Sequence, residues 1–193
     1  MLKAIEEKLV FLYKFARAPR QIGSVTPSSV FLAKKMIEPV PWAQVKSVAE
    51  LGAGTGAITR YLHKAIESDA KVLLFEKDHD LRAKLATQYP NFSNYTDACQ
   101  LGTALQYEGL RQIDCILSGL PFFNFPQSLR ERLMHQIVTS LKPGGLFIAF
   151  QYSQQMRKQL SRQLYIEKVH FVPWNVPPAF VYVCRKQPEP VQC

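Results

Sequence analysis

Short apolar runs alternate with amphipathic segments along most of the chain. Runs rich in β-branched and aromatic residues predict strands at 47–51, 71–76, 92–96, 112–117 and 144–151. The 3.6-residue patterns around them predict helices at 56–66, 79–88, 99–107, 127–141 and 153–163. Strands that alternate with helices in this way are typical of a parallel sheet with helices on both faces.

The pattern changes near the C-terminal end, where 165–172 and 179–186 predict two strands joined by only six residues, 173–178. So short a connection cannot form a parallel crossover, so these strands are expected to pair antiparallel. We therefore predict an α/β fold: a Rossmann-like, seven-stranded, mostly parallel sheet that ends in an antiparallel hairpin.

The chain divides into three segments. Residues 1–46 are expected to form an N-terminal helical cap of the same domain, with a helix at about 2–16, a link at 17–27 and a second helix that Ser28 and Ser29 begin. Residues 47–186 form the core, and 187–193 read as a flexible tail. The first helix carries one apolar stripe flanked by basic residues, and it either packs on its own domain or lies on a membrane surface.

Charge and cysteine content narrow the classes of partner. A net charge of +9 favours partners that carry phosphates, either nucleic acid or an anionic membrane. The four cysteines have no spacing typical of zinc ligands, so no metal is predicted. No signal peptide and no apolar run long enough to span a bilayer is visible, which predicts a cytoplasmic protein that at most lies peripherally on the membrane face. No obligate protein partner is predicted.

A glycine-rich turn follows the first predicted strand, at 50–56 (ELGAGTG). Glycines between a strand and a helix let a ligand lie against the backbone, and the spacing alone also fits a dinucleotide site. Glu50 favours a different ligand, because its negative charge would oppose a pyrophosphate but would suit a sulfonium and an ammonium group. A nicotinamide-dependent oxidoreductase and an inactive cofactor-binding module are the weaker alternatives.

The turn resembles the first motif of the class I S-adenosylmethionine-dependent methyltransferases, and 75–78 (FEKD) resembles the acidic end of their second strand. By this resemblance Glu76 binds the ribose hydroxyls of S-adenosylmethionine, whereas a surface pair with Lys77 is the alternative. Asp97 either reads the adenine amino group or caps a helix. The resemblance implies these cofactor-binding residues: Ser28, Glu50, Gly52, Ala53, Gly54, Thr55, Gly56, Glu76, Lys77, Asp97, Ala98 and Ser118. The product would be S-adenosyl-L-homocysteine.

The loop after the fourth predicted strand, 118–126 (SGLPFFNFP), resembles two groups of amino-directed methyltransferases. Adenine methyltransferases have a related loop there, and the soluble bacterial phospholipid N-methyltransferases share both this loop and a segment similar to 23–29 (GSVTPSS). The second likeness is the closer one. The residues expected to form the catalytic loop are Ser118, Gly119, Leu120, Pro121 and Phe122.

The resemblance implies N-methylation of phosphatidylethanolamine toward phosphatidylcholine, at an anionic membrane surface. Main-chain carbonyls near 119–120 would hold the amine, and Phe122, Phe123 or Tyr13 would face the cationic head group through cation–π contact. Arg17, Arg20, Lys34 and Lys35 are candidates for the lipid phosphate. The alternative is an adenine N6-methyltransferase acting on ribosomal RNA or another nucleic acid. Against it, the chain stops soon after the last strand, where ribosomal RNA dimethylases usually append a helical domain.

Overall fold

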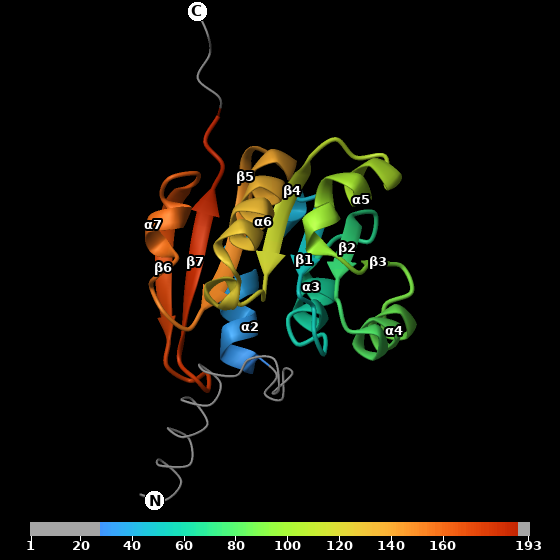
Figure 1. Cartoon of the computed structure of the whole chain (residues 1–193). Coiled ribbons are helices and arrows are strands. Elements are labelled where there is room, and N and C mark those ends of the chain that lie inside the picture. Colours follow the sequence, from blue (N-terminus) through green and yellow to red (C-terminus); the bar gives the residue numbers. More distant parts are fainter. Residues whose placement is uncertain (1–27, 189–193) are drawn as a thin grey trace, which may run out of the picture.

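Seven strands form a single mixed sheet in residues 28–188, the part of the chain that the computed structural model describes (Figure 1). The strands are β1 Ser47–Leu51, β2 Lys71–Phe75, β3 Ser93–Tyr95, β4 Ile113–Ser118, β5 Leu141–Gln151, β6 Tyr165–Val172 and β7 Ala179–Arg185. Their order is β3-β2-β1-β4-β5-β7-β6, and β7 pairs antiparallel with both of its neighbours. The predicted fold class is confirmed, including the C-terminal antiparallel hairpin.

Helices cover both faces of this sheet. They are α2 Val30–Ile37, α3 Thr59–Ala65, α4 His79–Gln88, α5 Leu101–Tyr107, α6 Gln127–Ser140 and α7 Arg157–Leu160, with single 3-10 turns η1 Trp42–Gln44, η2 Ala98–Gln100 and η3 Phe122–Asn124. Figure 1 shows α5 and α6 in front of the sheet and α2 and α3 behind it. Each face therefore has its own apolar core.

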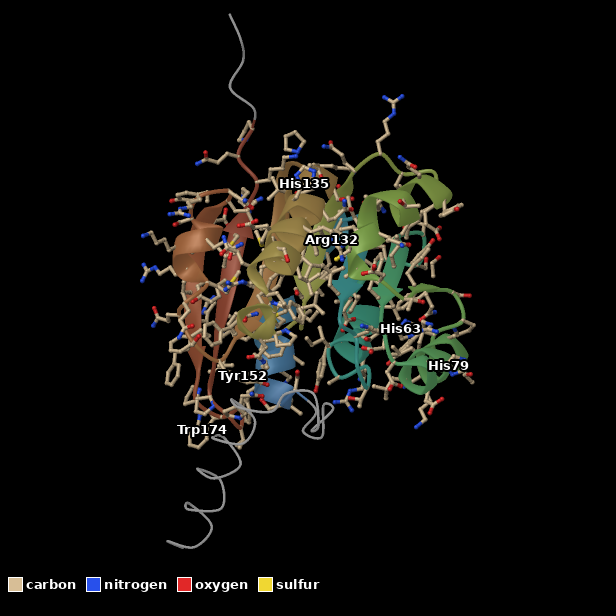
Figure 2. The ribbon with its side chains drawn as sticks, viewed as in Figure 1. His63, His79, Arg132, His135, Tyr152 and Trp174 are labelled. Carbon is tan, nitrogen blue, oxygen red and sulfur yellow. The ribbon has the colours of Figure 1, made fainter. Side chains whose placement is uncertain are left out.

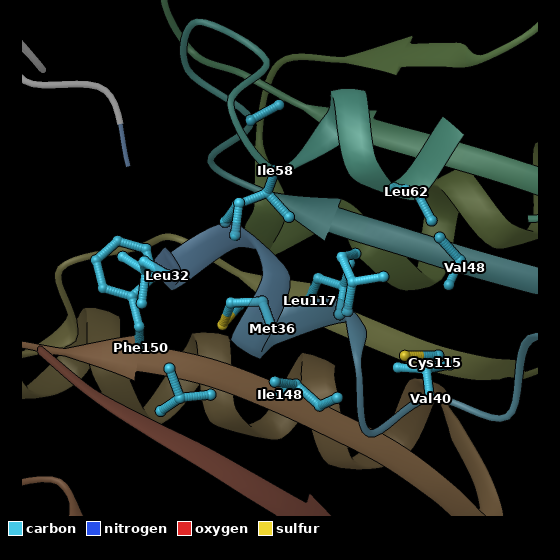
Figure 3. Packing of buried hydrophobic residues seen from close by; sticks show 14 of the residues in the cluster. Leu32, Met36, Val40, Val48, Ile58, Leu62, Cys115, Leu117, Ile148 and Phe150 are labelled. Carbon is cyan, nitrogen blue, oxygen red and sulfur yellow. The ribbon is translucent and has the colours of Figure 1, made fainter. Parts of the chain in front are cut away.

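Strand alternation divides the buried side chains between these two cores. In β1, Val48 packs with α2 and α3, whereas Ala49 and Leu51 pack with α5 and α6. Figure 3 shows the core on the α2 side, where Leu32 and Met36 lie over the sheet with no exposed surface. Burying a side chain of this size contributes about 1.5–3 kcal/mol, so this helix is firmly attached to the core.

The three largest differences between predicted and observed element boundaries each have a local reason. The helix predicted at 56–66 begins only at Thr59, because the glycines before it have positive φ angles that no helix accommodates. The helix predicted at 153–163 keeps one turn, 157–160, and Ser161 donates its hydroxyl to Lys158 O there, which competes with helix hydrogen bonds. The fifth strand begins at residue 141 instead of 144, since a register shift between β4 and β5 accommodates the segment 142–145.

The N-terminal segment is described only from Ser28 onward. Ser29 caps α2, because its side chain accepts a hydrogen bond from Leu32 N, in agreement with the predicted helix start. The helix predicted at 2–16, the link at 17–27 and most of the predicted tail lie outside the described residues. The segment assignment 1–46, 47–186 and 187–193 stays a prediction.

The strand register places the motif residues at one edge of the sheet. Leu51 at the end of β1 pairs with Phe75 of β2 and with Ser118 of β4, and Phe75 pairs with Tyr95 of β3. The residues that follow these four strand ends therefore lie side by side. The order of the strands reverses between β1 and β4, which is where ligands bind in open α/β sheets.

Candidate functional site

The glycine turn leaves β1 as a tight backbone loop. Gly52 and Ala53 both donate their N–H groups to Phe75 O, at 2.8 and 3.1 Å, which fixes the turn to β2. A methyl group on Gly52 would come within 2.9 Å of the Leu120 side chain, whereas one on Gly54 would meet no atom within 4 Å. Gly54 has a φ of +57°, so its missing side chain faces open space and leaves the backbone accessible.

Glu76, directly after β2, is bound to this turn. Its Oε2 accepts the N–H of Gly54 at 2.7 Å, and its Oε1 accepts the N–H of Asp78 at 2.8 Å. The alternative of a pair with Lys77 is not observed. Each carboxylate oxygen can accept a further hydrogen bond, so Glu76 stays suited to a ribose diol that approaches the half-buried turn.

Glu50 is fully buried beneath the turn, and one of its oxygens lacks a partner. Thr59, the first residue of α3, donates its hydroxyl to Oε2 at 2.8 Å, but Oε1 has no hydrogen-bond partner among the described residues. Burial raises the pKa of Glu50 to about 8, and the charge of Glu76 adds to the shift while Thr59 opposes it. A buried acceptor of this kind fits a ligand that brings an ammonium group, as S-adenosylmethionine does.

Asp97 follows β3 and caps the next turn. Its Oδ1 accepts the N–H of Cys99 at 2.9 Å, which makes Asp97 the N-cap of η2, with Ala98 as the first residue of that turn. The helix-cap role is thus observed, and the adenine contact stays a prediction. Lys77 and Thr55 are exposed near the same edge, and Ser28 precedes the cap of α2.

The loop after β4 touches the glycine turn. Gly119 donates its N–H to Leu51 O at 2.9 Å, and a methyl group on Gly119 would lie 3.0 Å from Gly52 O. Ser118 is buried, and its hydroxyl accepts the N–H of Leu120 at 3.3 Å. The two predicted motifs therefore meet where the strand order reverses.

Of the two neighbouring phenylalanines in this loop, one is buried and the other faces solvent. Phe122 is 1% exposed and packs edge-on against Phe125 and Phe147, with ring centroids 6.3 and 6.4 Å apart. Of the three aromatic rings proposed as alternatives for the head-group contact, Phe122 therefore presents no exposed face. Phe123 is 52% exposed and can present its ring to a cation. Tyr13, Arg17 and Arg20 lie outside the described residues.

Gln151 is a residue that sequence reasoning missed. It ends β5, is buried, and donates its side-chain N–H to Leu120 O at 2.9 Å. The only sequence signal is an amide side chain at the end of an otherwise apolar strand. Gln151 thus fixes one of the carbonyls that were expected to hold the substrate amine, which makes it a positioning residue.

Replacing Gln151 by leucine is expected to lower turnover about 10-fold, since one lost hydrogen bond is worth about 0.5–1.5 kcal/mol and the loop loses its fixed geometry. Affinity for S-adenosylhomocysteine, measured by calorimetry, should stay within about twofold, because Gln151 does not contact the glycine turn. Gln154→Leu, at an exposed position three residues on, is the matched control. An equal loss of affinity and turnover would contradict the positioning role.

Within residues 28–188, no cluster of three or more His, Cys, Asp or Glu side chains is arranged to hold a metal ion. The same residues contain no helix with the length and apolar content needed to cross a bilayer.

Comparison with known proteins identifies the family. Residues 48–145 match the family described as a methyltransferase domain. The ornithine lipid N-methyltransferase of Singulisphaera acidiphila is 32% identical over 186 residues, covering 94% of this chain and 97% of that protein. The chain belongs to the S-adenosylmethionine-dependent methyltransferases. The predicted enzyme class, an S-adenosylmethionine-dependent N-methyltransferase, is confirmed.

Two further comparisons concern either a segment of the sequence or the fold alone. The ribosomal RNA small subunit methyltransferase A of Maridesulfovibrio salexigens is 30% identical over 74 residues, 38% of this chain and 28% of that protein. The crystal structure of the N-methyltransferase NodS from Bradyrhizobium japonicum WM9, in complex with S-adenosylhomocysteine, superposes with a TM-score of 0.66 at 14% identity, covering 83% of this chain and 89% of NodS. The methyltransferase fold is thereby confirmed. The predicted cofactor, S-adenosylmethionine, is confirmed by the family to which the chain belongs.

Proposed function

We propose that this methyltransferase transfers methyl groups to the primary amine of a membrane lipid, with phosphatidylethanolamine as the substrate and phosphatidylcholine as the end product. The observation that carries the proposal is the match to a lipid N-methyltransferase over nearly the full length of both chains. Peripheral association with the anionic cytoplasmic membrane face is part of the same proposal, and the net charge of +9 supports it.

The residues at the sheet edge support this chemistry. When bound, the cofactor supplies a methyl group on a positively charged sulfur. Glu50 and Glu76 would hold the amino-acid and ribose ends of that cofactor, with Gly54 as the floor beneath it. The loop at 118–121 would orient a neutral lipid amine so that a nitrogen–carbon bond forms as the carbon–sulfur bond breaks, and the amine proton then leaves to water. Such positioning alone can supply about 7–11 kcal/mol of a barrier.

The exposed ring of Phe123 favours a cationic head group that becomes progressively methylated. Contact between an aromatic face and an alkylated ammonium is worth about 0.5–2 kcal/mol, and it strengthens when water is excluded. Phe123 lies two residues beyond the proposed amine-binding segment, at the rim of the loop. A permanently charged product can therefore be held here without a partner carboxylate.

The test is to incubate the purified protein with methyl-labelled S-adenosylmethionine and three separate acceptors: phosphatidylethanolamine vesicles, ornithine lipid vesicles and protein-free ribosomal RNA. Label is expected in the mono- and dimethylated forms of phosphatidylethanolamine and in phosphatidylcholine. Label in the ornithine lipid alone would keep lipid N-methylation but reject the proposed substrate. Label in RNA alone would reject lipid methylation altogether.

Methylation of ribosomal RNA adenine is the second candidate, because a segment of this chain matches a ribosomal RNA methyltransferase. That match covers little more than a third of the chain, in contrast to the full-length lipid relative. An RNA enzyme would also bind RNA with an affinity that falls steeply with salt, because binding releases counterions from the phosphates.

A further inference from the structure

Exposed apolar side chains gather at one end of the sheet. We call this surface the hairpin rim, and it consists of Val30, Phe31, Phe171, Trp174 and Val176, which are 43–73% exposed. Trp174 has the largest exposed fraction of the five. Figure 2 shows Trp174 at the outer end of the β6–β7 hairpin, at the same end of the molecule as Tyr152. Large side chains concentrated in this way mark an interaction surface.

A buried amide holds the two halves of the rim together. Asn175, only 3% exposed, lies between Trp174 and Val176, and its Oδ1 accepts the N–H of Ser29 at 2.9 Å. Its Nδ2 donates to Pro177 O at 2.7 Å. Because Ser29 directly precedes Val30, this contact sets the start of α2 beside the hairpin. The rim is therefore a built surface rather than a loose loop.

The rim lies at the same sheet edge as the loop 118–126 after β4, which we call the methyl-transfer loop. Phe180 near the start of β7 pairs with Gln151 at the end of β5, and Gln151 holds Leu120. The hairpin that carries Trp174 thus extends from the edge where the β4 loop and the glycine turn meet. A flat surface that covers the hairpin rim would therefore also lie over the β4 loop, where the proposed substrate amine binds.

Basic side chains flank the rim. Lys34 follows Phe31 by one helical turn. Lys168 lies on the face of β6 opposite to Phe171, which is the side that α2 covers, and its charge acts on His170 there together with that of Lys35. Lys35 is paired with Glu38 at 2.7 Å. The charge of Lys168 also acts on this carboxylate. The neighbouring Glu167 is bound by Arg185. Burial, and to a smaller extent the charges of Lys35 and Lys168, lowers the pKa of His170, whereas the charge of Glu38 opposes this shift.

We propose that the hairpin rim is the surface through which the enzyme docks on an anionic lipid bilayer, with Trp174 inserted at the head-group level and the flanking lysines facing lipid phosphates. Tryptophan is the side chain that favours this depth, and basic residues beside apolar ones give reversible binding to anionic surfaces. The choice of a lipid surface as partner rests on the proposed lipid substrate. Docking in this orientation brings the methyl-transfer loop to the layer where a lipid amine lies.

The two tryptophans of the chain, Trp42 and Trp174, make the test direct. Trp42 donates its ring N–H to Ile37 O in the core region. The variant Trp42→Phe leaves Trp174 as the only tryptophan, which can be excited selectively over the eight tyrosines. Vesicles of phosphatidylglycerol and phosphatidylcholine, which contain no amine to methylate, are then added to the full-length variant. Trp174 emission is expected to shift to shorter wavelength and to be quenched by brominated acyl chains. The mirror variant Trp174→Phe, which reports on Trp42, should show neither change.

Three results would overturn the proposal. In the first, the protein does not sediment with these vesicles. In the second, it sediments but acrylamide quenches Trp174 as strongly as without vesicles. In the third, Trp174 is already shielded from acrylamide without vesicles, which would mean that another part of the same chain, such as residues 1–27, covers the hairpin rim. Loss of unfolding cooperativity in Trp42→Phe is checked beforehand by circular dichroism.

A second measurement separates the rim from the proposed function. The double variant Phe31→Ala/Trp174→Ala is expected to bind the vesicles at least about 10-fold more weakly, since two large apolar side chains no longer enter the bilayer. It should lose activity to the same extent on amine lipid in vesicles but keep it on a short-chain, monomeric form of that lipid. If wild type methylates no lipid but Trp174 enters the bilayer, the proposed function is rejected and the docking surface is retained. If wild type methylates lipid while Trp174 stays in water, only the docking surface is rejected.

Discussion

Replacing Gly54 by alanine is expected to lower the affinity for S-adenosylhomocysteine about 100-fold and to abolish methyl transfer. A Cβ atom there meets no protein atom within 4 Å, so it projects into the open space where the cofactor lies against the backbone. An inserted methyl group in a well-packed contact costs about 1–3 kcal/mol, and each 1.4 kcal/mol is tenfold in affinity. Titration calorimetry with S-adenosylhomocysteine measures the loss.

Gly109→Ala is the matched control for this substitution. Gly109 also has a positive φ, +70°, and a methyl group there likewise meets nothing within 4 Å, but it lies in the connection between α5 and β4, at the opposite edge of the sheet. Both variants should lose about 1–2 kcal/mol of stability from the left-handed backbone, yet only Gly54→Ala should lose cofactor binding. Equal affinities in the two variants would show that the glycine turn does not form the cofactor site.

The placement of the site could be predicted because it depends on local order along the chain. Apolar runs fixed the strand ends, and in a parallel sheet those ends share one edge, so Gly52, Glu76 and Gly119 had to converge. The acid at position 50 favoured a cationic ligand over a pyrophosphate, because its charge follows from the residue type alone. The alternation of side chains along a strand and the residue types of a turn depend only on neighbouring residues, so both can be predicted from the sequence.

The contacts that orient the site could not be predicted, because each joins residues far apart in the chain. Gln151 reaches Leu120 across 31 residues and Asn175 reaches Ser29 across 146, and no local pattern indicates either pairing. The division between buried Phe122 and exposed Phe123 also depends on where Phe125 and Phe147 pack. Two neighbouring rings of one type carry no sequence signal that tells core from surface.

Burial of Glu50 makes the stability of the protein depend on pH. In the unfolded chain a glutamate has a pKa near its ordinary value of 4.5, whereas the pKa of buried Glu50 is about 8 in the folded protein. Between pH 4.5 and about pH 8, Glu50 is therefore protonated in the folded state and ionised in the unfolded state. The stability from this proton is fully present below pH 4.5 and is lost as pH rises through about 8. The slope in that window is about 1.4 kcal/mol per pH unit at most.

Glu50→Gln is expected to remove this slope and to weaken cofactor binding about 10- to 100-fold at pH 8, because a neutral amide cannot pair with the cofactor ammonium. Chemical denaturation between pH 5 and pH 8.5 should show the variant gaining stability relative to wild type as pH rises.

Binding an ammonium beside Glu50 should also drive off the proton of Glu50, so at pH 7 wild type should release up to about one more proton than the variant. Calorimetry in buffers of different ionisation enthalpy counts these protons. Identical proton release in the two proteins would mean that the cofactor's ammonium does not approach Glu50, and Thr59→Val, which removes the hydroxyl bound to Oε2, would then test whether this carboxyl serves the fold alone.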